Sequence, residues 1–249
     1  MNYILITKDN IDKEHICCAM SNNQANMKKE WLKARFEEGL VFYRSIERGK
    51  CFIEYIDAEK AWNPIEAPNY TFINCLWIAG SMKGHGYSND LLDYCINDSK
   101  NKGKKGICII SSKKKKGFLS DPKFLEHKGF KIADETPTGF TLMYLPFSDD
   151  TLTPKFKDNA KKGIIDEMGI VIYYTYQCPF TYYWVPREVE ALKKYNIDTK
   201  TILIDSALKA QNMPVPVTNY GLFIDGKYIS HEIQSDKKIL SLVGIKENN

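Results

Sequence analysis

The apolar residues of this chain fall into short runs separated by polar or glycine-containing segments, a pattern typical of an α/β protein. In one stretch, residues 70–78 form an aromatic and β-branched run, residues 83–86 (Lys-Gly-His-Gly) interrupt it, and from residue 88 apolar side chains recur at helical spacing. This pattern predicts a strand buried on both faces, a glycine loop and a helix. Glycines placed there let backbone N–H groups converge on an anion, so the expected ligand is a phosphate.

The chain before this stretch is predicted to form three strands and two helices. Strands are expected at residues 2–7, 40–47 and 50–56, and helices from residue 9 or 10 onward and at residues 26–38. The second helix has apolar residues on one side and its lysines and glutamates on the other. Arg48-Gly49 favours a hairpin turn between the last two strands. The two-proline segment 60–69 is expected to be irregular, with Trp62 able to close over a ligand.

Two groups of residues in this region can carry chemistry. Glu54 lies inside an apolar predicted strand, where an acid is either a buried general base or a solvent-facing residue. In the sequence His15-x-Cys17-Cys18, the thiols are either metal ligands or nucleophiles, or else small buried apolar residues. Adjacent cysteines on a helix point about 100° apart, which favours the buried interpretation.

The elements after the glycine loop complete a βαβ unit. A strand is expected at residues 106–111, a helix at 121–128 and strands at 131–133 and 140–145. The strand–helix–strand order predicts a right-handed crossover. Four lysines at residues 113–116 follow the strand, and a charge run of this kind is more often a solvated loop than a phosphate contact.

Composition and charge narrow the class of protein. With 249 residues and 43% hydrophobic content, the chain is long enough for one large domain or two ordinary ones. The net charge of +4 comes largely from local lysine clusters and does not imply a nucleic-acid partner. The seven cysteines show no repeated metal-ligand spacing, and the chain begins without a signal-type segment, so we expect a cytoplasmic protein with reduced thiols and no metal. No apolar run approaches the ~20 residues that span a membrane.

The order of predicted elements over residues 1–147 resembles the GNAT superfamily of acyl-CoA-dependent N-acetyltransferases. The family's loop pattern, Gln/Arg-x-x-Gly-x-Gly/Ala, is matched at both glycines by residues 81–86 (Ser-Met-Lys-Gly-His-Gly), and a Gly-Phe pair follows the last helix, as in the family. The resemblance implies that the backbone of this loop holds the pyrophosphate of acetyl-CoA, and that a main-chain N–H near Ile78 polarises the thioester carbonyl. The implied cofactor contacts are Trp77, Ile78, Ser81, Lys83, Gly84, His85, Gly86, Tyr87 and Ser88.

The same resemblance leaves the proton chemistry open. In many family members, a tyrosine four positions before the glycine of Gly-Phe acts as the general acid. This chain has Leu125 at that position, beside Phe124. A substrate ammonium must lose a proton before it can attack, and the departing thiolate can gain one. The candidate bases are Glu54 and His127, and the candidate acids are Tyr55 and Tyr144.

Residues 148–162 are polar and lack apolar periodicity, which predicts a linker before a second domain at residues 163–249. This domain is expected to contain strands at 169–174 and 201–205, a helix at 182–195, a hairpin at 222–229 through Asp225-Gly226, and a closing helix at 235–243.

This order of elements resembles a thioredoxin or glutaredoxin fold, with Pro216 as the candidate for the family's cis-proline. Cys178 occupies the first position of the family's Cys-x-x-Cys motif, and Thr181 replaces the second cysteine. A thiol at a helix N-terminus is expected to have a lowered pKa and to be nucleophilic. Cys178 is therefore either a working monothiol site or part of a fold kept for packing or dimerisation.

A GNAT module followed by a thioredoxin-like tail with Cys-Pro-x-Thr resembles the bacterial YoaP-type acetyltransferases, whose tail is known as the YoaP-like domain. The resemblance implies an N-acetyltransferase that transfers an acetyl group from acetyl-CoA to a primary amine of a small molecule or peptide. Two alternatives stay open: a non-catalytic acyl-CoA-binding sensor, and a monothiol redox protein that works through Cys178.

Overall fold

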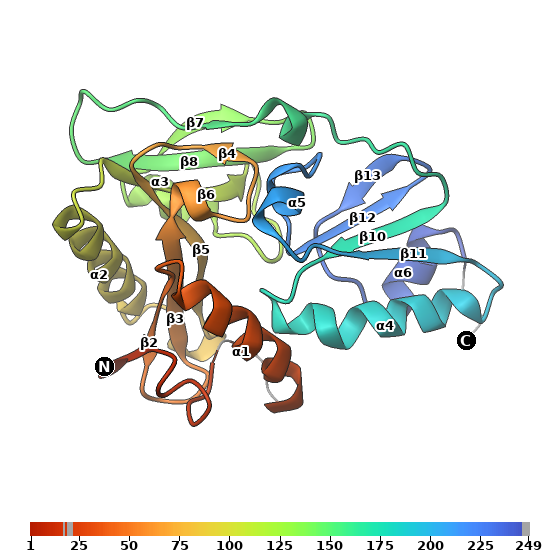
Figure 1. The fold of residues 1–249 in the computed structure, drawn as a ribbon, viewed down its shortest axis with the longest axis horizontal. Helices are drawn as coiled ribbons and strands as arrows, with labels where there is room; N and C mark the ends of the chain where they lie inside the picture. Colours follow the sequence, from red (N-terminus) through yellow and green to blue (C-terminus); the bar gives the residue numbers. More distant parts are fainter. Residues whose placement is uncertain (17, 19–21, 246–249) are drawn as a thin grey trace.

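The computed structural model describes residues 1–16, 18 and 22–245, which form two main sheets side by side (Figure 1). The strands of the first sheet are β1 (Tyr3–Ile6), β2 (Val41–Ser45), β3 (Cys51–Asp57), β5 (Tyr70–Ile78), β6 (Gly106–Ser112), β7 (Lys131–Glu135) and β8 (Phe140–Pro146). They lie in the order β1-β2-β3-β5-β6-β8-β7, and all neighbours are antiparallel except β5 and β6. The predicted mostly antiparallel sheet is therefore confirmed.

Helices cover both faces of this sheet. We call each main sheet with its helices a unit. The helices of the first unit are α1 (Asn22–Phe36), α2 (Tyr87–Asn101) and α3 (Pro122–His127), with short 3₁₀ helices η1 (Ala58–Lys60) and η2 (Gly80–Met82). Apolar side chains of α2 and α3 pack on one face of the sheet, whereas those of α1 pack on the other face. The predicted flanking helices are confirmed.

The parallel pair β5 and β6 separates after a few residues, which opens the sheet. Tyr70–Ile73 of β5 pairs with β6, but the rest of β5 pairs with β3 alone. Where the pairing ends, the register between β5 and β3 shifts and leaves Asn74 as an extra residue on β5. Such a bulge bends a strand and is frequent beside active sites. Consequently β5 is buried only over its first four residues, not along its whole length as predicted.

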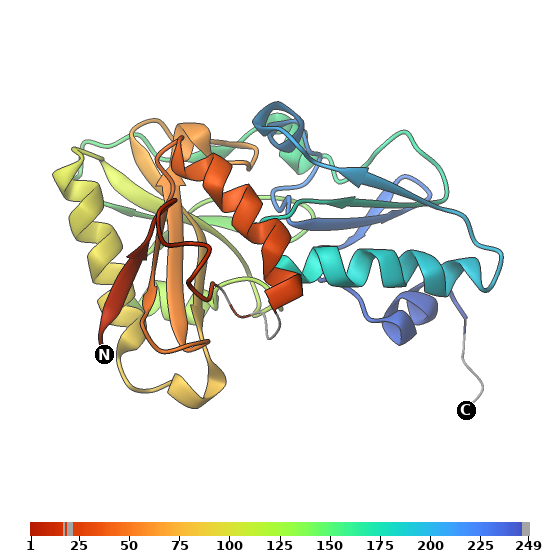
Figure 2. The same cartoon turned by 60° about the horizontal axis from the view of Figure 1, so that its bottom comes forward.

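The second sheet has four strands in the order β11-β10-β12-β13. Its elements are β10 (Ile170–Tyr174), α4 (Pro179–Lys193), β11 (Thr199–Leu203), α5 (Ala207–Gln211), β12 (Tyr220–Ile224), β13 (Lys227–Ser230) and α6 (Asp236–Leu242). β10 is parallel to β11 and antiparallel to β12, and the predicted hairpin turns at Asp225 and Gly226, both of which have positive φ. Helices α4 and α6 pack on one face, and the other face joins the hydrophobic cluster that contains α1 (Figure 2).

The segment between the sheets is packed, unlike the polar linker that we predicted. It contains β9 (Lys155–Phe156) and η3 (Asp158–Lys161), and β9 pairs with β4 (Ile65–Glu66), which lies in the loop predicted to be irregular. Phe156 and Ala160 are buried, and Trp62 is buried against Trp31 rather than closing over a ligand. The two units therefore share one continuous hydrophobic core.

Two further predictions about local structure are wrong, and one helix was missed. Residues 8–14 form turns instead of a helix, because the Asn10 side chain accepts a hydrogen bond from the Thr7 N–H and donates one to the Leu5 carbonyl. The peptide bond before Pro216 is trans, since no cis peptide is found among the described residues. Helix α5 was not predicted, and its five residues are too few to show a clear apolar period.

No helix in the described ranges has the length and apolar character needed to cross a membrane.

Candidate functional site

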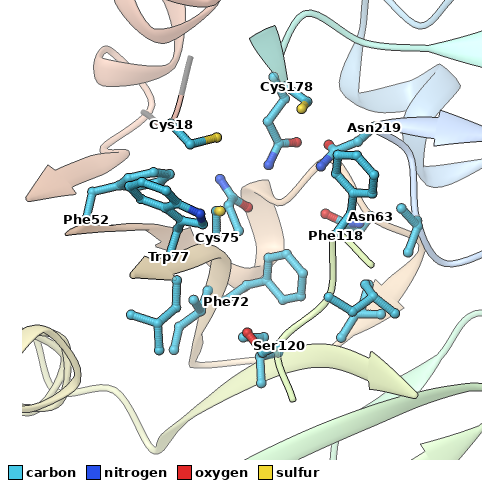
Figure 3. A pocket seen from close by; sticks show the side chains of 18 of the residues that line it. Cys18, Phe52, Asn63, Phe72, Cys75, Trp77, Phe118, Ser120, Cys178 and Asn219 are labelled. Carbon is cyan, nitrogen blue, oxygen red and sulfur yellow. The ribbon is translucent and has the colours of Figure 1, made fainter. Parts of the chain in front are cut away.

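Two adjoining cavities occupy the region where β5 and β6 separate. The loop cavity, about 450 Å³, lies beside the glycine loop at the start of α2. The inner cavity, about 350 Å³, lies between the first sheet and the second unit (Figure 3). Four residues line both cavities: Leu76, Trp77, Leu119 and Ser120. A molecule that passes between β5 and β6 can therefore reach from one cavity into the other.

The glycine loop presents a positively polarised surface to the loop cavity. Gly84 and Gly86 have φ values of +82° and +80°, a conformation that strongly favours glycine, and Gly86 is the N-cap of α2. The first N–H groups of a helix have no intrahelical acceptor, so those at the start of α2 are available to an anion. Lys83 and Lys115 also line this cavity. The predicted strand, loop and helix are confirmed.

Most of the predicted cofactor contacts meet at this cavity. All of the nine except Ser81 and His85 line it. The His85 ring instead stacks on Tyr87, with 5.7 Å between ring centroids. Phe124 and Asp121, which were not predicted as contacts, complete the wall on the side of α3.

The exposed edge of β5 offers backbone donors to the cleft. The Ala79 N–H donates to the Lys50 carbonyl on the side of β3, at 2.7 Å. Peptide groups alternate in direction along a strand, so the N–H groups of Leu76 and Ile78 point to the opposite side, where β6 has diverged. The predicted main-chain donor near Ile78 is thus aimed at the junction of the two cavities.

The inner cavity is assembled from segments far apart in the sequence. Figure 3 shows Phe72, Cys75 and Trp77 of β5 opposite Cys178 and Asn219 of the second unit. The remaining lining residues are Cys18, Lys28, Phe52, Asn63, Ile73, Asn74, Leu76, Ile109, Ile110, Phe118, Leu119, Ser120, Gln177, Pro179, Phe180 and Val217. The walls are mostly apolar and aromatic, with amide and thiol groups between them. The second unit therefore supplies one wall of this cavity.

Glu54 of β3 lies behind the lining residues of the inner cavity as part of a buried polar cluster. Its carboxylate is fully buried and accepts a hydrogen bond at 2.6 Å from Lys28, which is also buried. The side-chain amides of Asn74 and Gln177 donate to its Oε1 at 3.1 and 3.4 Å. Lys28 was predicted to face solvent with the other lysines of α1, and this is wrong. A buried carboxylate needs compensating donors, and here one of them comes from the second unit.

Cys178 lines the inner cavity and is the N-cap of α4. Thr181 is buried, and its hydroxyl donates to the carbonyls of Thr175 and Cys178 at 2.6 and 2.7 Å. The residue in place of a second cysteine therefore closes the first turn of the helix. Cys18 also lines the cavity, whereas Cys17 lies outside the described residues. Within those residues, no group of three or more His, Cys, Asp or Glu side chains could hold a metal ion.

The other predicted acids and bases lie away from both cavities. His127 is exposed at the end of α3, and Tyr144 of β8 packs against Tyr70 of β5. The Tyr55 hydroxyl donates to Asp98 at 2.8 Å, and burial raises the pKa of this phenol well above its ordinary value. Leu125, at the position of the family's tyrosine, is buried in the core. Of the predicted acids and bases, only Glu54 makes side-chain hydrogen bonds to residues that line a cavity.

Ser120 is a candidate functional residue that was not predicted from the sequence. It lines both cavities and immediately precedes Asp121, the N-cap of α3. No motif marks a serine in a loop as functional, so only its place at the junction identifies it.

Comparison with known proteins places the chain in a family. A model described as YoaP-like matches residues 199–240, from β11 into α6. Among solved structures, an N-acetyltransferase from Staphylococcus aureus Mu50 has a TM-score of 0.43 at 14% identity, over 59% of this chain and 100% of that chain. The GNAT family N-acetyltransferase YhbS from Escherichia coli, in complex with CoA, has a TM-score of 0.41 at 10% identity, over 63% and 89%.

A relative in Bacillus subtilis (strain 168), described as the uncharacterized N-acetyltransferase YoaP, is 47% identical over 247 residues, which is 98% of both chains. Similarity of this degree extends through both units of the structure. The chain therefore belongs to the family of the N-acetyltransferase YoaP.

Proposed function

We propose that this protein transfers an acetyl group from acetyl-CoA to an amine, with the coenzyme in the loop cavity and the amine in the inner cavity. The observation that carries the proposal is the junction of the two cavities where β5 and β6 separate. A coenzyme whose phosphates lie on the loop would extend its acyl end into this junction, where an amine in the inner cavity can attack it. The name of the Bacillus subtilis relative supports the same activity.

The residues around the loop cavity fit the phosphates of coenzyme A. The N–H groups at the start of α2 and the side chains of Lys83 and Lys115 would hold negative charge there. Gly84 has no side chain to cover its backbone, and a Cβ added there would meet no atom beyond the neighbouring residues within 4 Å. This loop is accordingly the proposed pyrophosphate site.

Chemistry at the junction follows from two kinds of donor. As the amine attacks, negative charge develops on the carbonyl oxygen, and the N–H groups of Leu76 and Ile78 are aimed where they can stabilise it. The C–S bond then breaks, and the thiolate, with a thiol pKa of about 8.5, leaves beside the Ser120 hydroxyl. We propose Ser120 as the hydrogen-bond donor to this sulfur in place of the family's tyrosine.

Glu54 is proposed as a positioning residue instead of the base. Its carboxylate is enclosed by Lys28, Asn74 and Gln177 and has no exposed surface, so it acts on the cavity through these side chains. His127 and Tyr144 line neither cavity, so neither is proposed to take part in the reaction.

The second unit is proposed to be a thioredoxin-like domain, at residues 163–249, that closes the acceptor site. Its strand order β11-β10-β12-β13, with α4 and α6 on one face, supports this fold. Cys178 at the start of α4 contributes to the cavity wall, where it would contact the acceptor. Position 181 is threonine and not a second cysteine, so contact with the acceptor is favoured over disulfide exchange within the domain.

The test is a calorimetric titration of acetyl-CoA into the full chain and two variants. Gly84→Glu places a carboxylate, in a strained conformation, at the pyrophosphate site and is expected to weaken binding at least about 100-fold. Gly80→Glu is the matched control, since Gly80 lies nearby in η2, has no positive φ and does not line the cavity. The control is expected to bind like the unmodified protein.

Release of free coenzyme A in the presence of amines then tests transfer itself. Binding without release across a broad amine panel would favour the acyl-CoA sensor. No binding of acetyl-CoA would contradict both the transferase and the sensor, and would leave the thiol-redox interpretation through Cys178.

A further inference from the structure

The charge of the inner cavity differs from that expected for a site that binds an ammonium ion. Lys28 is the only charged residue among the described residues that line it. The neighbouring positions 17 and 19–21, which the structure does not describe, are Cys, Ala, Met and Ser in the sequence. Among the described residues that line this cavity, no carboxylate therefore faces the acceptor.

The Glu54 carboxylate behind the wall already has its cation. Glu54 and Lys28 are both buried with 2.6 Å between Oε2 and Nζ. The Lys28 ammonium also lies over the rings of Phe42 and Phe52, at 5.4 and 5.6 Å from their centroids. A substrate ammonium would enter an apolar cavity beside this cation, lose its hydration, and find the nearest carboxylate already paired.

Glu54 also fixes how the two amides face the cavity. Asn74 and Gln177 both donate through their NH₂ groups to Oε1 of Glu54. Their carbonyl oxygens consequently point away from Glu54, and both residues line the inner cavity. A neutral amine can donate its N–H groups to such oxygens and keep its lone pair for attack, which an ammonium ion cannot do.

We propose that the acceptor enters the inner cavity as an uncharged, weakly basic amine on a flat apolar body, an aromatic amine being the simplest case. Phe72, Trp77 and Phe118 would contact the ring. This inference rests on the proposed function and adds the class of substrate. It also accounts for the lack of an accessible base, because a weakly basic amine carries no extra proton at neutral pH.

The reaction balances without a further reactant. The amine nitrogen forms a bond to the acyl carbon, the C–S bond breaks, and the nitrogen loses one proton. The thiolate that leaves becomes a thiol, so an amine and acetyl-CoA give an N-acetyl amide and coenzyme A.

The experiment is a binding measurement on the full chain saturated with coenzyme A. Aniline, which is uncharged at pH 7, and benzylamine, which is protonated there, are titrated at pH 7 and pH 8. We expect aniline to bind with the same affinity at both pH values and at least about tenfold more tightly than benzylamine at pH 7. Benzylamine affinity is expected to rise about tenfold per pH unit, as its uncharged fraction does.

Equal or tighter binding of benzylamine at pH 7, benzylamine affinity that does not change with pH, or no binding of aniline would overturn the inference. Failure of the proposed function gives different results: either coenzyme A would produce no heat in the loading titration, or bound acetyl-CoA would release no free coenzyme A with any amine.

A charge placed in the cavity wall provides a second test. Asn219 lines the cavity, and Asn219→Asp adds a carboxylate of nearly the same size. We expect this variant to bind benzylamine at least about tenfold more tightly, while aniline changes less than about threefold. Asn101→Asp, at an exposed position near the end of α2, is the control and is expected to leave both affinities unchanged. Unaltered amine selectivity in a folded Asn219→Asp variant would count against the inference.

Discussion

The loop cavity and the inner cavity adjoin each other, yet they offer opposite kinds of recognition. The loop cavity presents helix N–H groups and the exposed charges of Lys83 and Lys115, which suit a highly charged, solvated phosphate chain. The inner cavity presents aromatic rings and amides, and Lys28, the one cation among the described residues that line it, is paired with Glu54. On the proposed function, charge would hold the coenzyme, whereas shape and neutral hydrogen bonds would select the acceptor.

The largest expected effect comes from removing the cation of the inner cavity. Lys28→Met leaves Glu54 as a buried carboxylate without a counter-ion, and we expect it to lower the free energy of unfolding by about 3–5 kcal/mol. Urea denaturation of the full chain measures this. The control is Lys29→Met, since Lys29 is only partly buried and donates to the Asp12 carbonyl, and its cost is expected to stay below about 1 kcal/mol.

The double variant Lys28→Met/Glu54→Gln removes both charges and is expected to recover more than half of the loss. A cost for Lys28→Met as small as that of its control would mean that the pair is hydrated, and the contrast between the cavities would fail.

Glu188 shows how a buried acid behaves without a cation. It accepts hydrogen bonds from the Tyr220 hydroxyl at 2.8 Å and from the Gln234 N–H at 2.9 Å, and burial raises its pKa from 4.5 to about 7. The folded state thus holds a proton that the unfolded state releases above pH 4.5. The stability from this group is complete below pH 4.5 and is lost as pH rises through about 7.

We therefore expect the unmodified protein to lose about 3 kcal/mol relative to Glu188→Gln between pH 4.5 and pH 8. Urea midpoints of both proteins over this range measure the loss. A constant difference between the two, or an unmodified protein that gains stability relative to Glu188→Gln as pH rises, would show that Glu188 is ionised in the folded state.

Local sequence features predicted the loop cavity well. The apolar run of β5, the glycines at 84 and 86 and the apolar face of α2 lie within one continuous stretch, so the geometry follows from short-range rules. The separation of β5 from β6 was out of reach, because it depends on a one-residue shift in pairing at Asn74. That shift leaves no pattern in the sequence of β5 itself.

The inner cavity could not be predicted, because its walls come from distant parts of the chain. Asn74 and Gln177 lie in different units, and both donate hydrogen bonds to Glu54. The two units pack together, and the polar composition of residues 148–162 gave no sign of this packing. One signal was available for Lys28. It lies four residues before Leu32 and so shares its buried face, where an acid on the adjoining sheet would need a cation.

Gln177 tests whether the second unit shapes the acceptor site. Gln177→Ala removes an amide that holds Glu54 and lines the inner cavity, and we expect the KM for the amine to rise about tenfold with the KM for acetyl-CoA unchanged. Gln211→Ala is a matched control, because Gln211 also joins the units, through the Ala61 carbonyl at 3.0 Å, but lines neither cavity. A similar rise in the control would assign the effect to loosened docking of the units.

The smallest expected effect tests the role of the exposed Lys115 charge in the loop cavity. Lys115 lines this cavity with a largely exposed side chain that lies 3.3 Å from Asp121, so its charge is strongly screened. Lys115→Ala is expected to weaken acetyl-CoA binding about three- to fivefold at low ionic strength and not at all in about 0.5 M salt. Lys113→Ala is the control, since Lys113 pairs with Glu135 and does not line the cavity. A loss that persisted in salt would place Lys115 in a desolvated contact with phosphate, and the loop cavity would then resemble the inner one in excluding water.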